Sequence, residues 1–257
     1  MDKVILSKIL TLEAFGYYML ATVLVSGLFV VVSPMFNVIY PRFTALVVAG
    51  DIESLTNLYR MGSRIFAAVL FPVTMILVVF ADDLVRLWTG NAEVASNVAP
   101  IISLLAMGTA LHGVMYFPYA LQLAYGMTRL PLMICISLVV IMVPLIIYFA
   151  LMYGALGGAM AWLILNVLYV MFGTWLTHRH LLKGIAVRWL SQDVGIPLVW
   201  SILLGVVGYS VIQGTEYPAY LKLIYGSILA LVASLLSILM SHQLRLFVLK
   251  NFKSSGT

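Results

Sequence analysis

We predict an all-α polytopic membrane protein with about seven transmembrane helices. Of its 257 residues, 63% are hydrophobic and 9% are charged, whereas soluble domains carry about 25% charged residues. The uncharged runs have the length of about 17 to 25 residues that a helix needs to cross a bilayer. No segment alternates polar and apolar side chains in the manner of an outer-membrane strand. These observations exclude an ordinary soluble domain.

The first crossing is expected at about residues 15–39. Pro34 predicts a kink within it, because proline lacks the backbone N–H that a helix needs. Pro41, followed by Arg42, predicts the end of the helix at a membrane interface.

Residues 51–64 predict a short amphipathic helix on the membrane surface, with Asp51 as its N-cap. The second crossing is expected at about 65–81. The third lies within 94–128, a run that is too long for one straight crossing and that contains Pro100 and Pro118.

The uncharged run 130–177 has room for two crossings, and the glycines of residues 153–158 predict the turn between them. Two further crossings are expected at about 194–212 and 223–241. No connecting segment is long enough to form a separate extramembrane domain.

The distribution of cations predicts the orientation. If the first crossing runs from outside to inside, ten of the 14 Lys and Arg residues lie on the inner side, which the positive-inside rule assigns to the cytoplasm together with the C-terminus. The net charge of +5 therefore reflects topology, and we expect no nucleic-acid partner. The ten cations are Arg42, Arg60, Arg64, Arg129, Arg179, Lys183, Arg188, Arg245, Lys250 and Lys253.

The sequence contains no pattern typical of an enzyme. The four histidines are scattered, and no metal-binding, nucleophile or phosphate-loop motif occurs, so we expect neither a catalytic residue, nor a metal, nor a cofactor. Asp82 and Asp83 are neighbours and are best explained as a solvated turn, because acid–base catalysis needs partners that face each other.

The third crossing holds the best candidate for substrate binding. The spacing of His112, Tyr116 and Tyr119 places them on one helical face, with Gln122 at its edge and Gly108 above it. Inside a membrane, such groups face protein or a water-filled cavity. They line a substrate passage, or else they hold helices together by hydrogen bonds. Asn37 and Asn166 are weaker candidates with the same two explanations.

Several segments, in this order and spacing, resemble one known family, the Wzx-type O-antigen and polysaccharide flippases of the multidrug, oligosaccharidyl-lipid and polysaccharide exporter superfamily. The resemblance is to the C-terminal half of these proteins, over residues 2 to about 180. The segments are DKVILSKILTLEAFGYY, SPMFNVIYPRFTAL, LYRMGSRIFAAVLFP, FADDLVRLWTGN, PYALQLAYGMTR and YGALGGAMAWLI.

The resemblance implies a MATE-like fold of two helical bundles, of which this chain supplies the C-terminal one. Residues 1–12 would be the remnant of a truncated helix and an outer loop. Residues 13–177 would be the five-helix core, 178–193 a basic cytoplasmic loop, and 194–257 an additional helix pair with a basic tail. A missing N-terminal bundle is then an expected partner.

The implied function is the flipping of undecaprenyl-diphosphate-linked O-antigen or other polysaccharide units across the bacterial inner membrane. Implied partners are the lipid-linked oligosaccharide, membrane lipids, and a glycan polymerase with its chain-length regulator. A drug antiporter of the same superfamily is the alternative, followed by a membrane-embedded glycan polymerase or acyltransferase. An antiporter favours a carboxylate inside a crossing, and the enzymes need larger loops.

A lipid diphosphate requires cations, and Arg binds phosphate oxygens in a bidentate manner. We expect Arg42 and Arg129, which each adjoin a helix end at the cytoplasmic mouth, to make this contact. Alternatively, both arginines only set the orientation of the chain.

Overall fold

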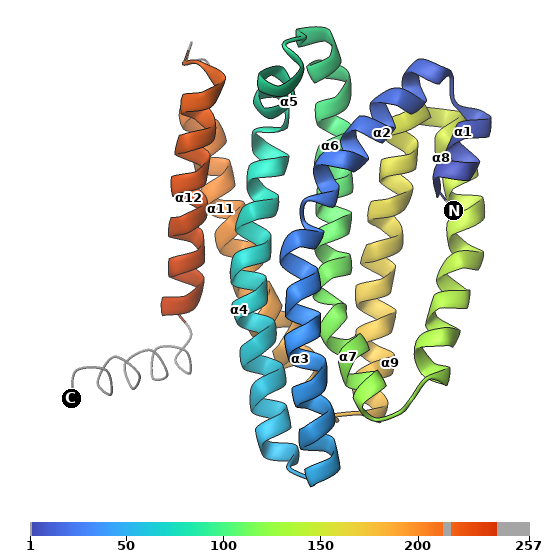
Figure 1. The fold of residues 1–257 in the computed structure, drawn as a ribbon, viewed down its shortest axis with the longest axis vertical. Coiled ribbons are helices and arrows are strands. Elements are labelled where there is room, and N and C mark those ends of the chain that lie inside the picture. Colours follow the sequence, from blue (N-terminus) through green and yellow to red (C-terminus); the bar gives the residue numbers. More distant parts are fainter. Residues whose placement is uncertain (1, 213–216, 241–257) are drawn as a thin grey trace.

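The chain forms an all-helical membrane bundle (Figure 1), described in a computed structural model for residues 2–212 and 217–240. Six stretches within these ranges are long and apolar enough to cross a membrane. One of the six contains a sharp break at Gly154 and therefore crosses twice, which gives seven crossings. The predicted fold class is confirmed. The predicted tail cations Arg245, Lys250 and Lys253 lie outside the described residues.

The helices follow each other along the chain with short connections. Their bounds are α1 Asp2–Ile9, α2 Leu12–Ser26, α3 Phe29–Ala49, α4 Ile52–Val79, α5 Ala81–Thr89, α6 Ala92–Val114, α7 Tyr116–Ala124, α8 Arg129–Leu168, the π-helical segment η1 Tyr169–Gly173, α9 Thr174–His180, α10 Ala186–Arg188, the π-helical segment η2 Trp189–Val194, α11 Gly195–Ile212 and α12 Ala219–Leu239.

The first crossing consists of two helices, and it ends later than predicted. A tight turn at Gly27 and Leu28 separates α2 from α3, whereas Pro34 and Pro41 both remain inside α3. The predicted end at Pro41 and Arg42 is wrong, because membrane helices tolerate an internal proline when neighbouring groups satisfy the freed backbone.

Helix α3 instead ends at Gly50, whose φ of 70° is the left-handed conformation that glycine adopts without strain. The N–H of Gly50 donates to the carbonyl of Val47, and the N–H of Asp51 donates to that of Leu46. This pattern is the Schellman motif, which satisfies the last carbonyls of a helix.

Helix α4 is one continuous helix of 28 residues, so the predicted separate surface helix at residues 51–64 is wrong. The N-cap prediction is confirmed: the Asp51 carboxylate accepts from the N–H of Ser54 at 2.9 Å. Hydrogen bonds from the side chain and the backbone of Ser54 hold the pKa of Asp51 below its usual value. Leu55 and Tyr59 are fully buried, which explains the amphipathic pattern by contact with protein.

The third crossing is bent at Met115, which separates α6 from α7. Pro118 lies in the first turn of α7, where a missing N–H costs no helical hydrogen bond, and Pro100 stays inside α6. Together with α4, this crossing forms the centre of the bundle: 56% and 61% of the residues in the most apolar 18-residue stretches of α4 and of α6–α7 are buried, against 11% in the corresponding stretch of α8–α9.

The glycines of residues 153–158 form the predicted turn between two crossings. Gly154 has φ 61° and ψ −136°, a conformation that is open only to glycine. At Gly157 the chain returns so close that an added Cβ would lie 1.9 Å from the carbonyl oxygen of Phe149. Nearby, α1 packs on α8 and buries Leu6 completely.

The last helix pair is attached to the core at both ends and along its length. At one end, η2 is joined to α4 by ion pairs of Asp193; at the other, Lys222 of α12 lies 3.5 Å from Asp83 of α5. Between them, small residues allow close contact: an added Cβ at Gly226 would lie 2.5 Å from the ring of Phe80.

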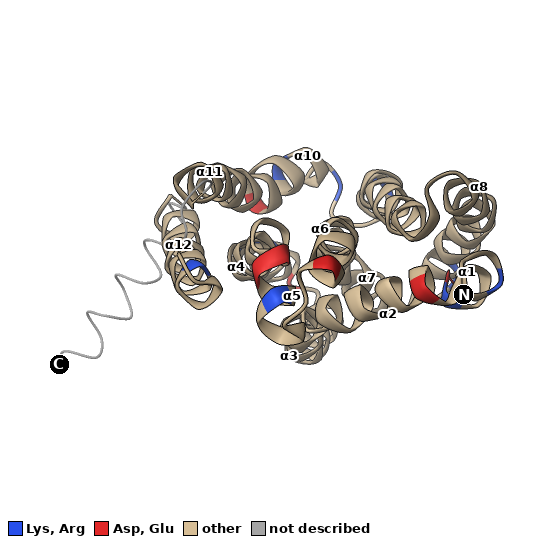
Figure 2. Cartoon of the chain, turned by 90° about the horizontal axis from the view of Figure 1, so that it is seen from above, with Lys and Arg blue, Asp and Glu red and all other residues tan. Residues whose placement is uncertain are grey.

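Charge separates the two ends of the bundle. The lower end in Figure 1, where α3 meets α4 and α7 meets α8, holds seven cations and three acids among the described residues, a net charge of +4. The upper end, onto which Figure 2 looks, holds four cations and five acids, a net charge of −1. The inner-side cations of the sequence prediction that are described therefore share one end.

The turn at Gly154 and Gly157 provides a test of this fold. Gly157→Ala should lower the thermal unfolding temperature strongly in detergent, because the new methyl group collides with backbone that has no free space to move. The matched control is Gly16→Ala, whose Cβ meets nothing within 4 Å and which should be neutral or slightly stabilising. Equal unfolding temperatures for the two variants would contradict the fold at this turn.

Candidate functional site

Three helical crossings contribute to one row of half-buried aromatic rings, which we call the aromatic face. Ring centroids lie 5.7 to 5.8 Å apart from Tyr169 to His112, from His112 to Tyr116, from Tyr116 to Phe36, and from Phe36 to Tyr119. Tyr40 stacks on Phe36 at the end of the row. The face consists of Phe36, Tyr40, His112, Tyr116, Tyr119 and Tyr169.

The predicted residues His112, Tyr116 and Tyr119 therefore lie together. Although α6 is interrupted at Met115, the ring of His112 still contacts that of Tyr116, because the bend is small enough to keep both on one side. Phe36, contributed by α3, links Tyr116 to Tyr119. The structure thus adds an aromatic ring from a separate crossing to the predicted stripe.

His112 also makes a polar contact to the neighbouring crossing. Its Nδ1 lies 3.1 Å from Oδ1 of Asn166, and Nδ2 of Asn166 donates to the carbonyl of Trp162. His112 and Asn166, which the sequence indicated as separate candidates, therefore form a hydrogen-bonded pair. The pair holds α6 to α8 and at the same time places an imidazole beside the aromatic rings.

Gly108 allows α6 and α8 to approach above this pair. An added Cβ would lie 2.6 Å from the indole of Trp162, whose Nε1 donates to the hydroxyl of Thr109. The close contact therefore packs α6 directly on α8.

Gln122 does not belong to the aromatic face. Its side chain is buried, and Nε2 donates to the hydroxyl of Thr177 on α9 at 2.6 Å. This hydrogen bond joins α7 to α9, as expected from the explanation that the polar residue holds helices together.

Arg42 and Arg129 are exposed at the cation-rich end, and neither forms an ion pair within the described ranges. Arg42 lies on α3 two residues from Tyr40, and Arg129 begins α8. Asn37, on the same helix as Arg42, is exposed as well.

A polar hollow of about 510 Å³ lies at the other end of the bundle, between α2, α6 and the turn of α8. Tyr17, Asn97 and Tyr153 line it, together with Glu13, which accepts a hydrogen bond of 2.7 Å from Tyr17. Asn97 and His112 are fifteen residues apart, which places them on the same side of α6. The hollow and the aromatic face therefore share one side of this helix.

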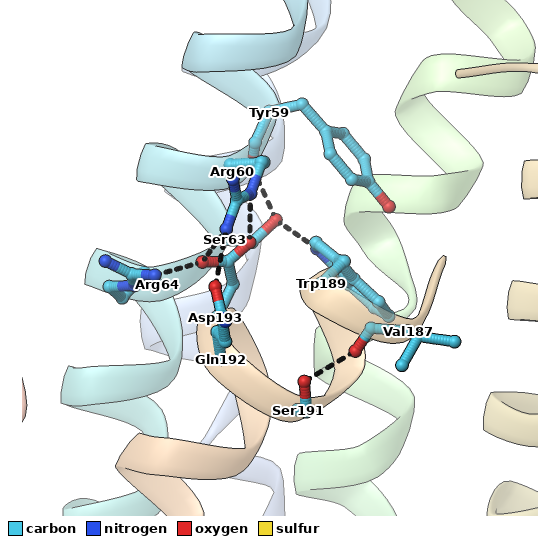
Figure 3. A network of polar contacts seen from close by, with 9 residues as sticks. All are labelled: Tyr59, Arg60, Ser63, Arg64, Val187, Trp189, Ser191, Gln192 and Asp193. Carbon is cyan, nitrogen blue, oxygen red and sulfur yellow. Dashed lines mark hydrogen bonds and ion pairs between the residues drawn. The ribbon is translucent and has the colours of Figure 1, made fainter. Parts of the chain in front are cut away.

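A buried charge cluster lies on α4 (Figure 3). From the sequence, its arginines Arg60 and Arg64 were expected only to set the orientation of the chain in the membrane. Asp193, which is fully buried, accepts from Nε of Arg60 at 2.8 Å and from a terminal nitrogen of Arg64 at 2.5 Å. Gln192 accepts a further bond from Arg60 at 3.1 Å. One carboxylate thus joins two arginines of consecutive turns, because residues i and i+4 lie on one face of a helix.

Aromatic packing closes the cluster toward the core. The indole Nε1 of Trp189 donates to the hydroxyl of Ser63, which donates to the carbonyl of Tyr59 (Figure 3). The rings of Tyr59, His178 and Trp189 lie 5.6 to 5.8 Å apart. The segment predicted as a basic loop, residues 178–193, therefore contributes two fully buried side chains, Trp189 and Asp193.

Sequence reasoning missed this cluster because its partners are far apart in the chain. The available signal was the spacing of Arg60 and Arg64 on one helical face, together with a single acid, Asp193, immediately before an apolar crossing. Among the described residues, no group of three His, Cys, Asp or Glu could hold a metal ion.

The charge cluster makes a stability prediction. Asp193→Asn should destabilise the protein by about 3 to 5 kcal/mol, because it leaves two arginines without their buried counter-ion. Unfolding in detergent, followed by circular dichroism, measures the effect. Asp82→Asn is the matched control, since the Asp82–Arg86 pair is largely exposed and should contribute at most about 1 kcal/mol. A small effect at Asp193 would show that the cluster is not structural.

Comparison with known proteins gives a match for the first part of the chain. No curated protein and no solved structure matches the chain. Residues 1–96 match the model of a family described as polysaccharide biosynthesis protein. The matched part runs from α1 into the first turn of α6 and includes Phe36, Arg42, Arg60 and Arg64. The resemblance to the polysaccharide flippase family is therefore confirmed over these residues.

Proposed function

We propose that the protein takes part in flipping lipid-linked polysaccharide units, with undecaprenyl-diphosphate-linked O-antigen as the representative substrate, across the bacterial inner membrane. The observation that carries the proposal is the aromatic face: a row of half-buried rings within membrane crossings, with an imidazole beside it. A polysaccharide-related transport role also agrees with the family match.

Aromatic rings and neutral hydrogen-bonding groups suit a sugar. The apolar faces of pyranose rings pack on aromatic rings, while tyrosine hydroxyls and an imidazole supply hydrogen bonds without a fixed charge. In the polar hollow, Tyr17, Tyr153 and Asn97 repeat this combination at the other end. We propose that a glycan contacts the aromatic face first and the hollow later.

The lipid diphosphate would then bind at the cation-rich end. Arg42 and Arg129 are exposed there, and a guanidinium forms bidentate hydrogen bonds with phosphate oxygens. Arg42 lies on α3, the helix that also contributes Phe36 and Tyr40 to the aromatic face. We propose that this end faces the cytoplasm, in line with the excess of positive charge.

Transport would proceed by rocking of this bundle against an N-terminal bundle, with the aromatic face at their interface. We propose that the close packing of Gly108 against Trp162 lies between the aromatic face and the polar hollow and changes during this motion. The flipped unit would pass to a glycan polymerase and its chain-length regulator.

Replacement of an aromatic ring tests the sugar contact. Tyr119→Ala should reduce the initial rate of surface polysaccharide display by about tenfold, because it removes a ring that packs on Phe36 and on the glycan. His112→Ala should act in the same direction. The measurement is complementation of a flippase-deficient strain by the full protein at matched expression.

Tyr148→Ala is the matched control, because Tyr148 is 60% exposed and lies outside the aromatic face. If all three variants display polysaccharide at the wild-type rate, the aromatic face does not bind the glycan.

A conservative change at Arg42 tests the phosphate contact. Arg42→Lys keeps the charge and the topology signal, but it removes the bidentate geometry, so display should fall at least about fivefold. Arg188→Lys, also exposed at this end, should have no effect. Unchanged display in Arg42→Lys would assign Arg42 to topology alone.

A further inference from the structure

The hydrogen bond between His112 and Asn166 has a fixed direction. Nδ2 of Asn166 donates to the carbonyl oxygen of Trp162 at 2.8 Å, so this end of the amide must be its nitrogen. The other end, Oδ1, can only accept, and it lies 3.1 Å from Nδ1 of His112. In the neutral imidazole, Nδ1 therefore carries the proton, and Nε2 is left as a hydrogen-bond acceptor.

This acceptor nitrogen is open to a ligand. Nε2 of His112 makes no hydrogen bond to the described residues, and it is not one of the enclosed side-chain atoms that lack a partner. His178 provides the contrast: its Nδ1 lies 2.8 Å from the carbonyl oxygen of Thr174, and its Nε2 is enclosed. Of these two histidines, His112 alone can therefore offer an acceptor to a bound molecule.

The rings around His112 are uncharged. Its imidazole lies 5.7 to 5.8 Å, between ring centroids, from Tyr116, Trp162 and Tyr169. Tyrosine hydroxyls both donate and accept, so they adapt to either kind of ligand group. An imidazole nitrogen with a fixed tautomer does not adapt, because it accepts from a hydroxyl or an amide N–H and its lone pair repels a carboxylate oxygen. His112 therefore gives this part of the aromatic face a defined preference.

We propose that Asn166 is a positioning residue that holds His112 as the acceptor for a hydrogen-bond donor of a neutral sugar. The donor is a ring hydroxyl or an acetamido N–H, and a sugar carboxylate is excluded from this position. A small number of placed polar groups of this kind sets the orientation of a ligand on apolar rings. The inference rests on the proposed function, because it assigns a substrate class to the same aromatic face.

Nitrogen NMR of the imidazole rings tests the tautomer without any substrate. The full chain is prepared in nanodiscs at neutral pH with isotope-labelled histidine, and the spectrum of His112→Gln identifies the signals of His112. We expect a protonated Nδ1 and an unprotonated Nε2. A protonated Nε2 in the wild type, with or without a proton on Nδ1, would overturn the proposal.

Two variants separate positioning from general packing of the helices. Asn166→Leu removes the acceptor of the Nδ1 proton, so a large share of the molecules should carry the proton on Nε2 instead. Thr109→Val is the matched control: it removes the hydrogen bond from Trp162 between the same helices, α6 and α8, and should keep the wild-type tautomer. An equal change in both variants, or no change in either, would show that Asn166 does not position the imidazole. The wild-type spectrum remains decisive if Asn166→Leu fails to fold.

Two soluble sugars test the substrate class. Methyl glucoside, whose ring hydroxyls donate, should shift the Nε2 signal of His112 and leave the Nδ1 signal in place. Its fully O-methylated derivative keeps the apolar ring faces but has no donor, so it should leave both signals unchanged at the same concentration. An equal shift with both sugars, or no shift with either, would overturn the assignment of His112 to a sugar donor.

These results are distinct from those of the display assay. Normal display by Tyr119→Ala would contradict the proposed function, whatever the tautomer of His112. A protonated Nε2 in the wild type would overturn the role of Asn166 even if Tyr119→Ala impairs display.

Discussion

The carboxylate of Asp193 imposes the strongest constraint on this bundle. A buried charge must be paired, because removal from water costs several kcal/mol for each ion. Asp193 meets this requirement only where α4 presents Arg60 and Arg64 on consecutive turns. The pairing fixes the connector before α11, and with it the position of α11 beside α4. The ion pair of Lys222 with Asp83 is more exposed and contributes less at the other end.

Much of the fold could be predicted from local signals. The lengths of the apolar runs indicated seven crossings, Asp51 indicated a helix start, and the glycines of residues 153–158 indicated a turn. The wrong predictions rest on local signals whose structural meaning depends on the surroundings of the residue. Proline at position 41 ends a helix in water, but a membrane helix accommodates it. The amphipathic pattern of residues 52–64 fitted a membrane surface, whereas the buried Leu55 and Tyr59 contact protein.

The candidate site likewise contains residues that could be predicted from local spacing and residues that could not. The stripe of His112, Tyr116 and Tyr119 could be predicted, because three residues of one crossing share a face by spacing alone. Their partners could not: Phe36 lies on another crossing, and Asn166 is 54 positions from His112. Gln122 had the same local pattern, yet its hydrogen bond to Thr177 places it between helices. Contacts between distant segments decide which polar residue faces a ligand and which holds helices together.

The proposed function depends on contact between the aromatic face and a glycan. Photo-crosslinking from position 119 measures this contact directly: a benzophenone side chain replaces Tyr119 in the full protein, in membranes that contain a lipid-linked oligosaccharide with a labelled sugar. Binding of a glycan to the aromatic face predicts a labelled adduct at position 119 and none at position 148, which is exposed on α8 outside the aromatic face. Equal labelling at both positions, or labelling at neither with substrate present, would contradict it.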